Sequence, residues 1–254
     1  MKPEYEIKRL IRCNESDITC TGGVVFIGDG HTGKTHAALN LSSFQQGGFI
    51  NAQCQTISKS INLEFEYFIA HSNIEKFRVT ISSQLFIMPG QKGKAEAGTG
   101  LAFEDALDLY FDIRSINEVI VLVLTYNLNS ITTFQNLEYW LNRAIEQELI
   151  KEYTNIILLG THLDQEHTII VKDEEIEAGR KFISNHVEER IGVKIDLDRI
   201  ITTKISNMTQ EGIPEFQEEI TDCFFRSFDI KQIINEHLCL ETHSLEKISN
   251  IENE

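Results

Sequence analysis

The stretch GDGHTGKT, residues 28–35, has the residue types and spacing that bind the phosphate groups of a nucleotide. Gly28 and Gly33 allow the backbone to bend so that successive N–H groups curl around phosphate oxygens. Lys34 supplies a positive charge for the terminal phosphates, and the Thr35 hydroxyl is a ligand for Mg²⁺. The stretch lies between an apolar run and a helical pattern, which is the context that such a loop requires. We therefore predict that the chain binds a nucleoside diphosphate or triphosphate.

The elements that must position this loop follow an alternating order along the chain. Short apolar runs suited to strands alternate with longer helical patterns, and two neighbouring runs of period two form a hairpin. We therefore predict an α/β fold of three layers, with a mainly parallel six-stranded sheet and helices on both faces. The predicted strands are 24–27, 61–70, 77–88, 119–124, 155–160 and 199–203, and the predicted helices lie at 35–44, 101–113, from Ser130, around Ile183 and around Phe216.

The ends of the chain differ from its middle in composition. Residues 1–20 form an N-terminal extension in which we identify no clear element. Residues 21–226 make up one domain, and residues 227–254 form an acidic tail or a short helix.

Charge and composition exclude several classes of function. The formal net charge of the 254 residues is −16, which opposes nucleic acid as a partner and unaided binding to anionic membranes. No apolar run is long enough to cross a bilayer, and we identify no signal peptide and no lipid anchor of the chain's own. The five cysteines are scattered without a C-x-x-C pair, which is typical of a reducing compartment and speaks against a metal cluster. We expect a cytoplasmic protein that is peripheral at a membrane only through an adaptor.

A polar sequence after the strand at 155–160 resembles the base-reading loop of the Ras-like small GTPases. In GTHLD, Thr161, His162 and Asp164 match the family's [N/T]-K-x-D pattern. A carboxylate at Asp164 can accept hydrogen bonds from both the ring N–H and the exocyclic amine of guanine, a donor pair that adenine lacks. His162 stands where the family has lysine, and its imidazole could stack on the base instead. The resemblance covers Thr21 to Arg226 and implies a P-loop small G domain with GTP or GDP and Mg²⁺.

Two more segments support the resemblance. ITTK follows the last predicted strand and resembles the family's S-A-K loop, so Thr203 and Lys204 are predicted to contact the guanine through their backbone. The helical stretch from Ser130 resembles the third helix of Rab-type members. In the phosphate loop, the resemblance assigns Asp29, Gly30, His31 and Thr32 to the nucleotide site, together with the residues named above.

The sequence IMPGQ at 87–91 resembles the start of the family's second switch. The resemblance implies that the N–H of Gly90 senses the γ-phosphate and that Gln91 orients the attacking water. The proline in this motif resembles archaeal Ras-like and bacterial polarity GTPases. Ile87 stands where the family has an aspartate that holds Mg²⁺ through water, and it continues the apolar face of its strand. The segment after Gln91 is predicted to be mobile and to order around the γ-phosphate.

The first switch needs a hydroxyl that reaches Mg²⁺ ahead of the hairpin. Thr56 resembles the equivalent residue of Rab-type proteins, and we favour it because threonine is the usual residue there. Ser60 fits the spacing of the bacterial polarity group better. Both remain candidate ligands beside Thr35.

The resemblance implies a GTP-dependent molecular switch that hydrolyses GTP to GDP and phosphate. Gly30 leaves room for the glutamine and the water, while no arginine lies in the loop to speed the reaction, so slow intrinsic turnover is expected. A GTPase-activating protein, an exchange factor and an effector are the implied partners. The alternative is a scaffold that holds GTP with little hydrolysis, as a homodimer or a Rag-like heterodimer, which Ile87 and His162 favour. A P-loop kinase would need lid arginines, and none occurs between Gln91 and Arg114.

Overall fold

The computed structural model describes residues 11–14, 17–44, 59–70, 76–90, 103, 106, 118–230 and 232. Its strands are β1 Ile11–Asn14, β2 Asp17–Ile27, β3 Lys59–Ala70, β4 Lys76–Ile87, β5 Val119–Asn127, β6 Asn155–Thr161 and β7 Ile200–Lys204. Its helices are α2 Lys34–Phe44, α4 Ile131–Gln135, α5 Leu137–Glu146, α6 Asp173–Ile191 and α7 Ile213–Phe228, with short 3₁₀ turns η1 Glu166–Thr168 and η2 Leu197–Arg199.

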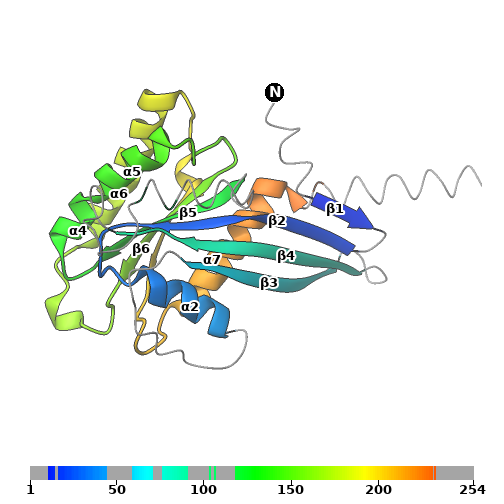
Figure 1. The fold of residues 1–254 in the computed structure, drawn as a ribbon, viewed down its shortest axis with the longest axis horizontal. Helices are drawn as coiled ribbons and strands as arrows, with labels where there is room; N and C mark the ends of the chain where they lie inside the picture. Colours follow the sequence, from blue (N-terminus) through cyan, green and yellow to red (C-terminus); the bar gives the residue numbers. More distant parts are fainter. Residues whose placement is uncertain are drawn as a thin grey trace, which may run out of the picture.

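The strands form one sheet in the order β3-β4-β2-β5-β6-β7, with β1 paired to β2 (Figure 1). Strands β4, β2, β5, β6 and β7 run parallel to one another, which confirms the predicted α/β class and its parallel sheet. The predicted hairpin is β3 with β4, paired antiparallel from Lys59 opposite Ile87 to Ala70 opposite Lys76. The sheet differs from the predicted six strands, because five parallel strands and the two antiparallel strands β1 and β3 bring it to seven.

Helices cover both faces of the sheet, as expected for buried parallel strands. Along β2, Val24 and Phe26 contribute to the core under α2 and α7, while Val25 and Ile27 contribute to the core under α5 and α6. Figure 1 shows α4, α5 and α6 grouped together, apart from α2 and α7. The helix predicted from Ser130 is two helices, α4 and α5, separated at Asn136.

Both ends of the domain extend beyond the predicted bounds. The extension at 1–20 was expected to lack an element, but it contains β1 and the first residues of β2. Ile18 and Cys20 are buried there between more exposed threonines, a short alternation with too few large apolar residues to stand out in the sequence. At the other end, α7 continues past Arg226, and Phe228 and Ile230 are buried in the core.

The strand order reverses beside β2. The chain leaves β2 through α2 toward β3 and β4 on one side, and β5 pairs with the other side of β2. In open α/β sheets, ligands bind outside the carboxyl ends of the strands at such a reversal. Residues 28–35 follow the carboxyl end of β2 at this point. Among the described helices, none is both long enough and apolar enough to cross a membrane.

Phe216 of α7 tests the core between α7 and β2. Its ring is fully buried and meets Phe26 of β2 edge to face, with 6.2 Å between the ring centres. We predict that Phe216→Ala lowers the free energy of unfolding by about 3–5 kcal/mol, because it removes buried surface and leaves a cavity. Urea denaturation measures the loss. Ile170→Ala, at a side chain that is 53% exposed, is the control, and an equal loss in both variants would contradict the prediction.

Candidate functional site

The loop at 28–35 joins β2 to α2 and has the backbone that its glycines allow. Gly28 has φ of 144° and Gly33 has φ of 83°, both in the region that glycine adopts without strain. A Cβ at Gly28 would lie 2.2 Å from the carbonyl oxygen of Thr125, and one at Gly33 would lie 2.7 Å from Nδ2 of Asn207. The loop can therefore pass this close to β5 and to the residues after β7 only with glycine at both positions.

Lys34 lies inside the loop rather than in solvent. Its ammonium donates hydrogen bonds to the carbonyl oxygens of Gly28, at 2.8 Å, and Asp29, at 2.6 Å. Burial lowers the pKa of Lys34 to about 8, while the charge of Asp29 acts in the opposite direction. The lysine therefore remains mostly protonated at neutral pH and keeps a positive charge inside the loop. The carbonyl oxygen of Asp29 also accepts a hydrogen bond from Oγ1 of Thr32 at 2.9 Å.

Thr161, at the end of β6, connects the phosphate loop to the predicted base-reading loop. Its side chain is fully buried, and Oγ1 donates to the carbonyl oxygen of Thr32 at 2.8 Å. His162 follows with a positive φ of 65°, and its Nδ1 lies 2.9 Å from Oγ1 of Thr161. Burial lowers the pKa of His162, the charge of Asp164 acts in the opposite direction, and His36 lowers it further. At neutral pH this imidazole is therefore predominantly uncharged.

The carboxylate of Asp164 is exposed at the edge of the sheet and is oriented by Ser206. Ser206 is fully buried, and its Oγ donates to Oδ1 of Asp164 at 2.7 Å. The same Oγ accepts from the backbone N–H of Thr209 at 2.9 Å. One oxygen of Asp164 is thus held by the loop that follows β7, so the direction of its carboxylate is set by two different loops.

Thr203 and Lys204, predicted from ITTK, lie at the end of β7, and their backbone contact with guanine stays a prediction. Thr203 is buried within β7, and the ammonium of Lys204 pairs with the carboxylate of Asp173 at the start of α6. The two residues that instead reach the loops are Ser206 and Asn207. Asn207 Nδ2 donates to the carbonyl oxygen of Gly33 at 3.3 Å. In the sequence, Ser206 and Asn207 belong to ISN, which directly follows ITTK. ITTK was the closer match to the S-A-K motif of the Ras-like family.

Asn207 is held in turn by α2. Nδ2 of Asn40 donates to the carbonyl oxygen of Asn207 at 3.2 Å, and Asn40 itself is buried. The loop after β7 is therefore tied both to Asp164 and to the helix that begins at Lys34.

The segment that resembles the second switch begins against the phosphate loop. The N–H of Gly30 donates to the carbonyl oxygen of Gly90 at 2.8 Å, and a Cβ at Gly90 would lie 2.3 Å from the nitrogen of Gly30. Ile87 is 4% exposed and packs in the core with the α2 and α7 side of the sheet. Gln91 and Thr56 lie outside the described residues, and Ser60 is in β3 opposite Phe86.

The side chain of Asp29 makes contacts that the sequence did not indicate. Oδ2 accepts from Nδ2 of Asn136 at 2.5 Å, and Oδ1 accepts from Nε1 of Trp140 at 2.7 Å. Both donors belong to the start of α5, more than a hundred residues further along the chain. The phosphate loop is therefore anchored on this side as well.

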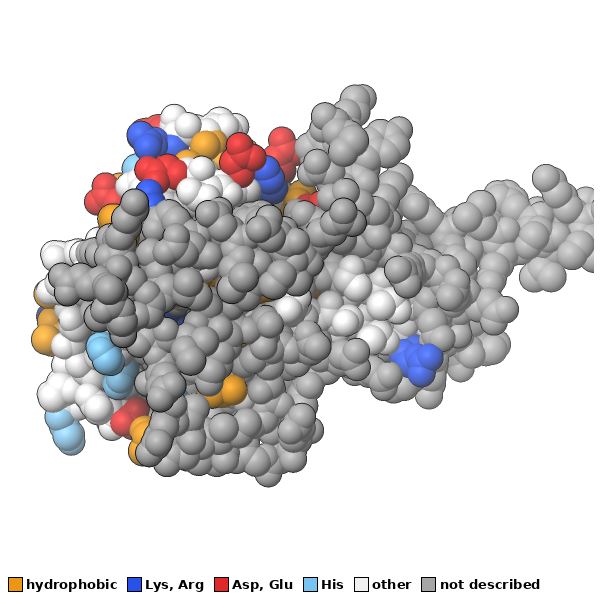
Figure 2. All heavy atoms as spheres, viewed as in Figure 1, with side chains coloured by type: hydrophobic (Ala, Val, Ile, Leu, Met, Phe, Trp, Pro, Cys, Tyr) orange, Lys and Arg blue, Asp and Glu red, His pale blue; other side chains and the backbone are white. Residues whose placement is uncertain are grey.

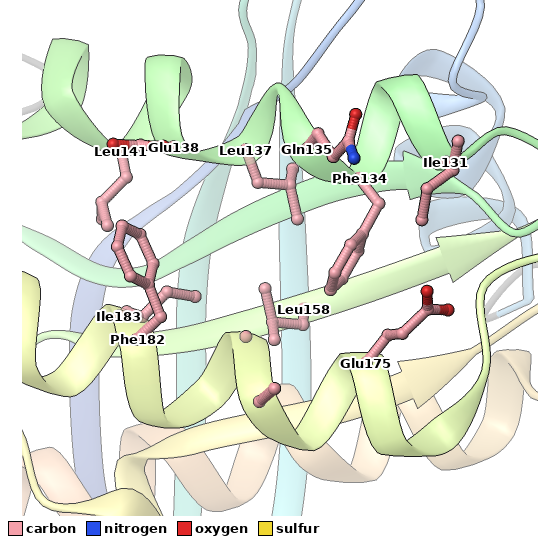
Figure 3. A pocket seen from close by; sticks show the side chains of 12 residues that line it. Ile131, Phe134, Gln135, Leu137, Glu138, Leu141, Leu158, Glu175, Phe182 and Ile183 are labelled. Carbon is pink, nitrogen blue, oxygen red and sulfur yellow. The ribbon is translucent and has the colours of Figure 1, made fainter.

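One face of the molecule and one cavity show what lies around these loops. Figure 2 shows histidine side chains at the end of the molecule where these loops lie, and mixed acidic and basic side chains over α5 and α6. A cavity of about 410 Å³ lies between α4–α5 and α6, with Phe134, Leu158 and Phe182 among its lining (Figure 3). No residue of 28–35 and none of Thr161, His162 and Asp164 lines it. The cavity is therefore separate from the site built by the loops.

Together the loops after β2, β6 and β7 bring together the N-terminal end of α2, one buried ammonium and one exposed carboxylate. Such a site can hold a ligand that has an anionic end and, at the other end, a pair of hydrogen-bond donors. Comparison of the sequence with models of known protein families and with curated proteins gave no match. The chemistry of the site therefore has to carry the functional conclusion.

Gly90 tests the contact between the segment that resembles the second switch and the loop at 28–35. We predict that Gly90→Ala separates the two backbones, because the new methyl group would overlap the nitrogen of Gly30. Hydrogen exchange at the Gly30 amide should then accelerate about tenfold as it loses its acceptor. Gly192→Asn is the control, since a Cβ there meets nothing within 4 Å and asparagine tolerates the positive φ of 70° at this helix end. Unchanged exchange at Gly30 in Gly90→Ala would contradict the contact.

Proposed function

We propose that the protein is a GTP-binding molecular switch with the fold of a P-loop small G domain, which hydrolyses GTP to GDP and phosphate. The observation that carries the proposal is the hydrogen bond from Thr161 to the carbonyl oxygen of Thr32. It joins the loop suited to phosphates to the loop that carries Asp164. A single ligand with its phosphates at 28–35 would therefore have its base beside Asp164, as a guanine nucleotide requires.

The phosphate end of the ligand suits the groups in the loop. The N–H groups of the loop and the start of α2 present partial positive charge to an anion, and Lys34 adds a full charge. A Cβ at Gly30 would meet no atom closer than 3.7 Å, so there is open space on this side of the loop. Thr35, in the first turn of α2, would hold Mg²⁺ together with Thr56 or Ser60. When bound, Mg²⁺ would neutralise phosphate charge and orient the terminal phosphate.

The base end of the ligand suits Asp164 and His162. The carboxylate of Asp164, with one oxygen fixed by Ser206, has acceptor sites left for the N–H and amine of guanine. His162 stays mainly uncharged at neutral pH, so its ring can stack on the base without a charged group being desolvated. Ser206 and Asn207, rather than Thr203 and Lys204, are the residues we propose for the guanine side.

The chain's own groups have separate roles in hydrolysis. Gln91, which directly follows Gly90, would hold the attacking water, and the Gly90 backbone would move against Gly30 when the terminal phosphate changes. Since the loop supplies no arginine, we propose slow turnover that an activating protein accelerates, with an exchange factor and an effector as further partners. We propose the cytoplasm as the location, with any membrane contact through an adaptor.

Ile87 favours a second candidate function. Its side chain is buried in the core at the position where the Ras-like family has a metal-supporting aspartate. Weak support of Mg²⁺ would leave a protein that binds GTP and hydrolyses it poorly. In that case the protein would act as a nucleotide-holding scaffold subunit in a dimer.

The guanine side is tested by Ser206→Ala and its control, Lys204→Ala. We predict that Ser206→Ala weakens GDP binding about tenfold, because Asp164 loses the hydrogen bond that orients it. Lys204→Ala should leave the affinity unchanged, since Lys204 pairs with Asp173 instead. Calorimetric titration with GDP measures both. Equal affinity of the unmodified protein for GDP and ADP would contradict the guanine assignment, and a loss confined to Lys204→Ala would contradict the role of Ser206.

Hydrolysis is tested by phosphate release from GTP and Mg²⁺. We predict that Gln91→Leu slows the release severalfold or more while GTP still binds, because leucine cannot position water. Lys34→Ala, which removes the charge in the loop, is the control for lost binding. If the unmodified protein binds GTP and releases no phosphate over hours, the scaffold function replaces the switch.

A further inference from the structure

Asp29 lies at the point where the phosphate loop meets the helical layer on the α5 side. Its carboxylate accepts from Asn136 at 2.5 Å through one oxygen and from Trp140 at 2.7 Å through the other. Trp140 is fully buried, so its indole N–H requires a protein acceptor. The two donors are one helical turn apart and therefore lie on the same face at the start of α5. This spacing matches the two oxygens of one carboxylate.

The backbone of Asp29 is bonded to the functional groups of the loop. Its carbonyl oxygen accepts from the ammonium of Lys34 at 2.6 Å and from Oγ1 of Thr32 at 2.9 Å. The next residue, Gly30, donates its N–H to Gly90 at 2.8 Å. A displacement of Asp29 would therefore shift the acceptor of Lys34 and the donor that holds Gly90.

Trp140 also contacts the chain beyond Gly90. The ring of Phe103 packs against the indole with 5.7 Å between the ring centres, and both side chains are buried. Gly90 is bonded to the loop at Gly30, while Phe103 is packed on the residue that binds Asp29. The loop at 28–35 is thus connected to Gly90 through Gly30, and to Phe103 through Asp29 and Trp140. Gly90 and Phe103 lie on either side of Gln91 in the sequence.

We propose that Asp29 is a positioning residue that ties the phosphate loop to α5 through Asn136 and Trp140 and transmits nucleotide binding to that helix. The proposal rests on the proposed function for the identity of the ligand. Asp29 need not touch the nucleotide. Its carboxylate instead fixes the loop in the conformation that receives phosphate. A change in the conformation of the loop then moves Trp140, whose indole N–H is bound to Asp29. Trp140 is the one tryptophan in the sequence, so tryptophan emission reports on the surroundings of this single indole, which include Asp29 and Phe103.

The first measurement is the tryptophan emission of the full chain during titration with unlabelled GDP. We expect GDP to shift or quench the emission of the unmodified protein, because the hydrogen bond and the field at the indole change with the loop. In Asp29→Ala, GDP should still bind by calorimetry, but the emission change should disappear. Asp29→Asn keeps an oxygen acceptor for the indole and should restore part of the change. A full emission change in Asp29→Ala would overturn the proposal.

The second measurement is the rate of GDP dissociation in a double-mutant cycle. We expect Asp29→Ala and Trp140→Phe each to accelerate dissociation about tenfold, and the double variant to do so about tenfold as well, because both remove the same contact. Independent effects would give about a hundredfold in the double variant and would overturn the proposal. If Trp140→Phe does not fold, Asn136→Ala takes its place in the cycle. Asn136 is the second donor to Asp29 and is less buried than Trp140.

A matched control comes from Asn142 on the same helix. Its Oδ1 lies 2.8 Å from Nε2 of His186 of α6, so Asn142→Ala removes a polar contact of α5 without touching the loop. We expect it to leave the GDP dissociation rate and the emission change as they are. If the unmodified protein binds no nucleotide, the proposed function fails and this coupling with it. If the protein binds GDP while the emission and the cycle show no coupling, only the role of Asp29 fails.

Discussion

The close approach of backbone segments at the carboxyl edge of the sheet is the constraint on which the site depends. A side chain at Gly28 would overlap the backbone of Thr125 at the end of β5, and one at Gly90 would overlap the backbone of Asp29 and Gly30. Because these contacts exclude even a methyl group, the loops pack directly on one another and can be joined by short hydrogen bonds. The site is therefore built on closely packed loops, which the side chains of Thr161, Ser206 and Asn207 join by hydrogen bonds.

The electrostatics of the site contrast with those of the whole chain. The formal net charge is −16, yet the loop proposed to bind phosphate contains a buried ammonium and the N-terminal end of α2. Two carboxylates near the loops, Asp29 and Asp164, are engaged by neutral donors from Trp140, Asn136 and Ser206. Neutral donors stabilise a carboxylate without bringing a second charge, so Lys34 keeps its role as the positive group of the loop. Local geometry, not net charge, decides what this site can bind.

The order of elements was predictable because hydrophobic periodicity is a local property. The hairpin β3–β4, the buried strands β5 and β6, and α2 lie where the pattern indicated. Errors occurred where the local signal was weak. The strand β1 and the start of β2 have few large apolar residues, and the break at Asn136 interrupts a continuous apolar stripe with no proline or glycine to announce it. The switch segments with Gln91 and Thr56 remain predictions, since they lie outside the described residues.

The sequence by itself determined the loop at 28–35, with the positive φ of Gly28 and Gly33 and the charge of Lys34, because backbone freedom and a charge at fixed spacing are properties of neighbouring residues. It also placed Thr161 and Asp164 at the end of a strand. Only the tertiary structure decided which distant side chains complete the site. Ser206 and Asn207 reach it instead of Lys204, and Asn136 and Trp140 hold Asp29. These contacts depend on how α5 and the loops pack at the edge of the sheet, and this packing joins residues far apart in the chain that no local pattern of residues relates.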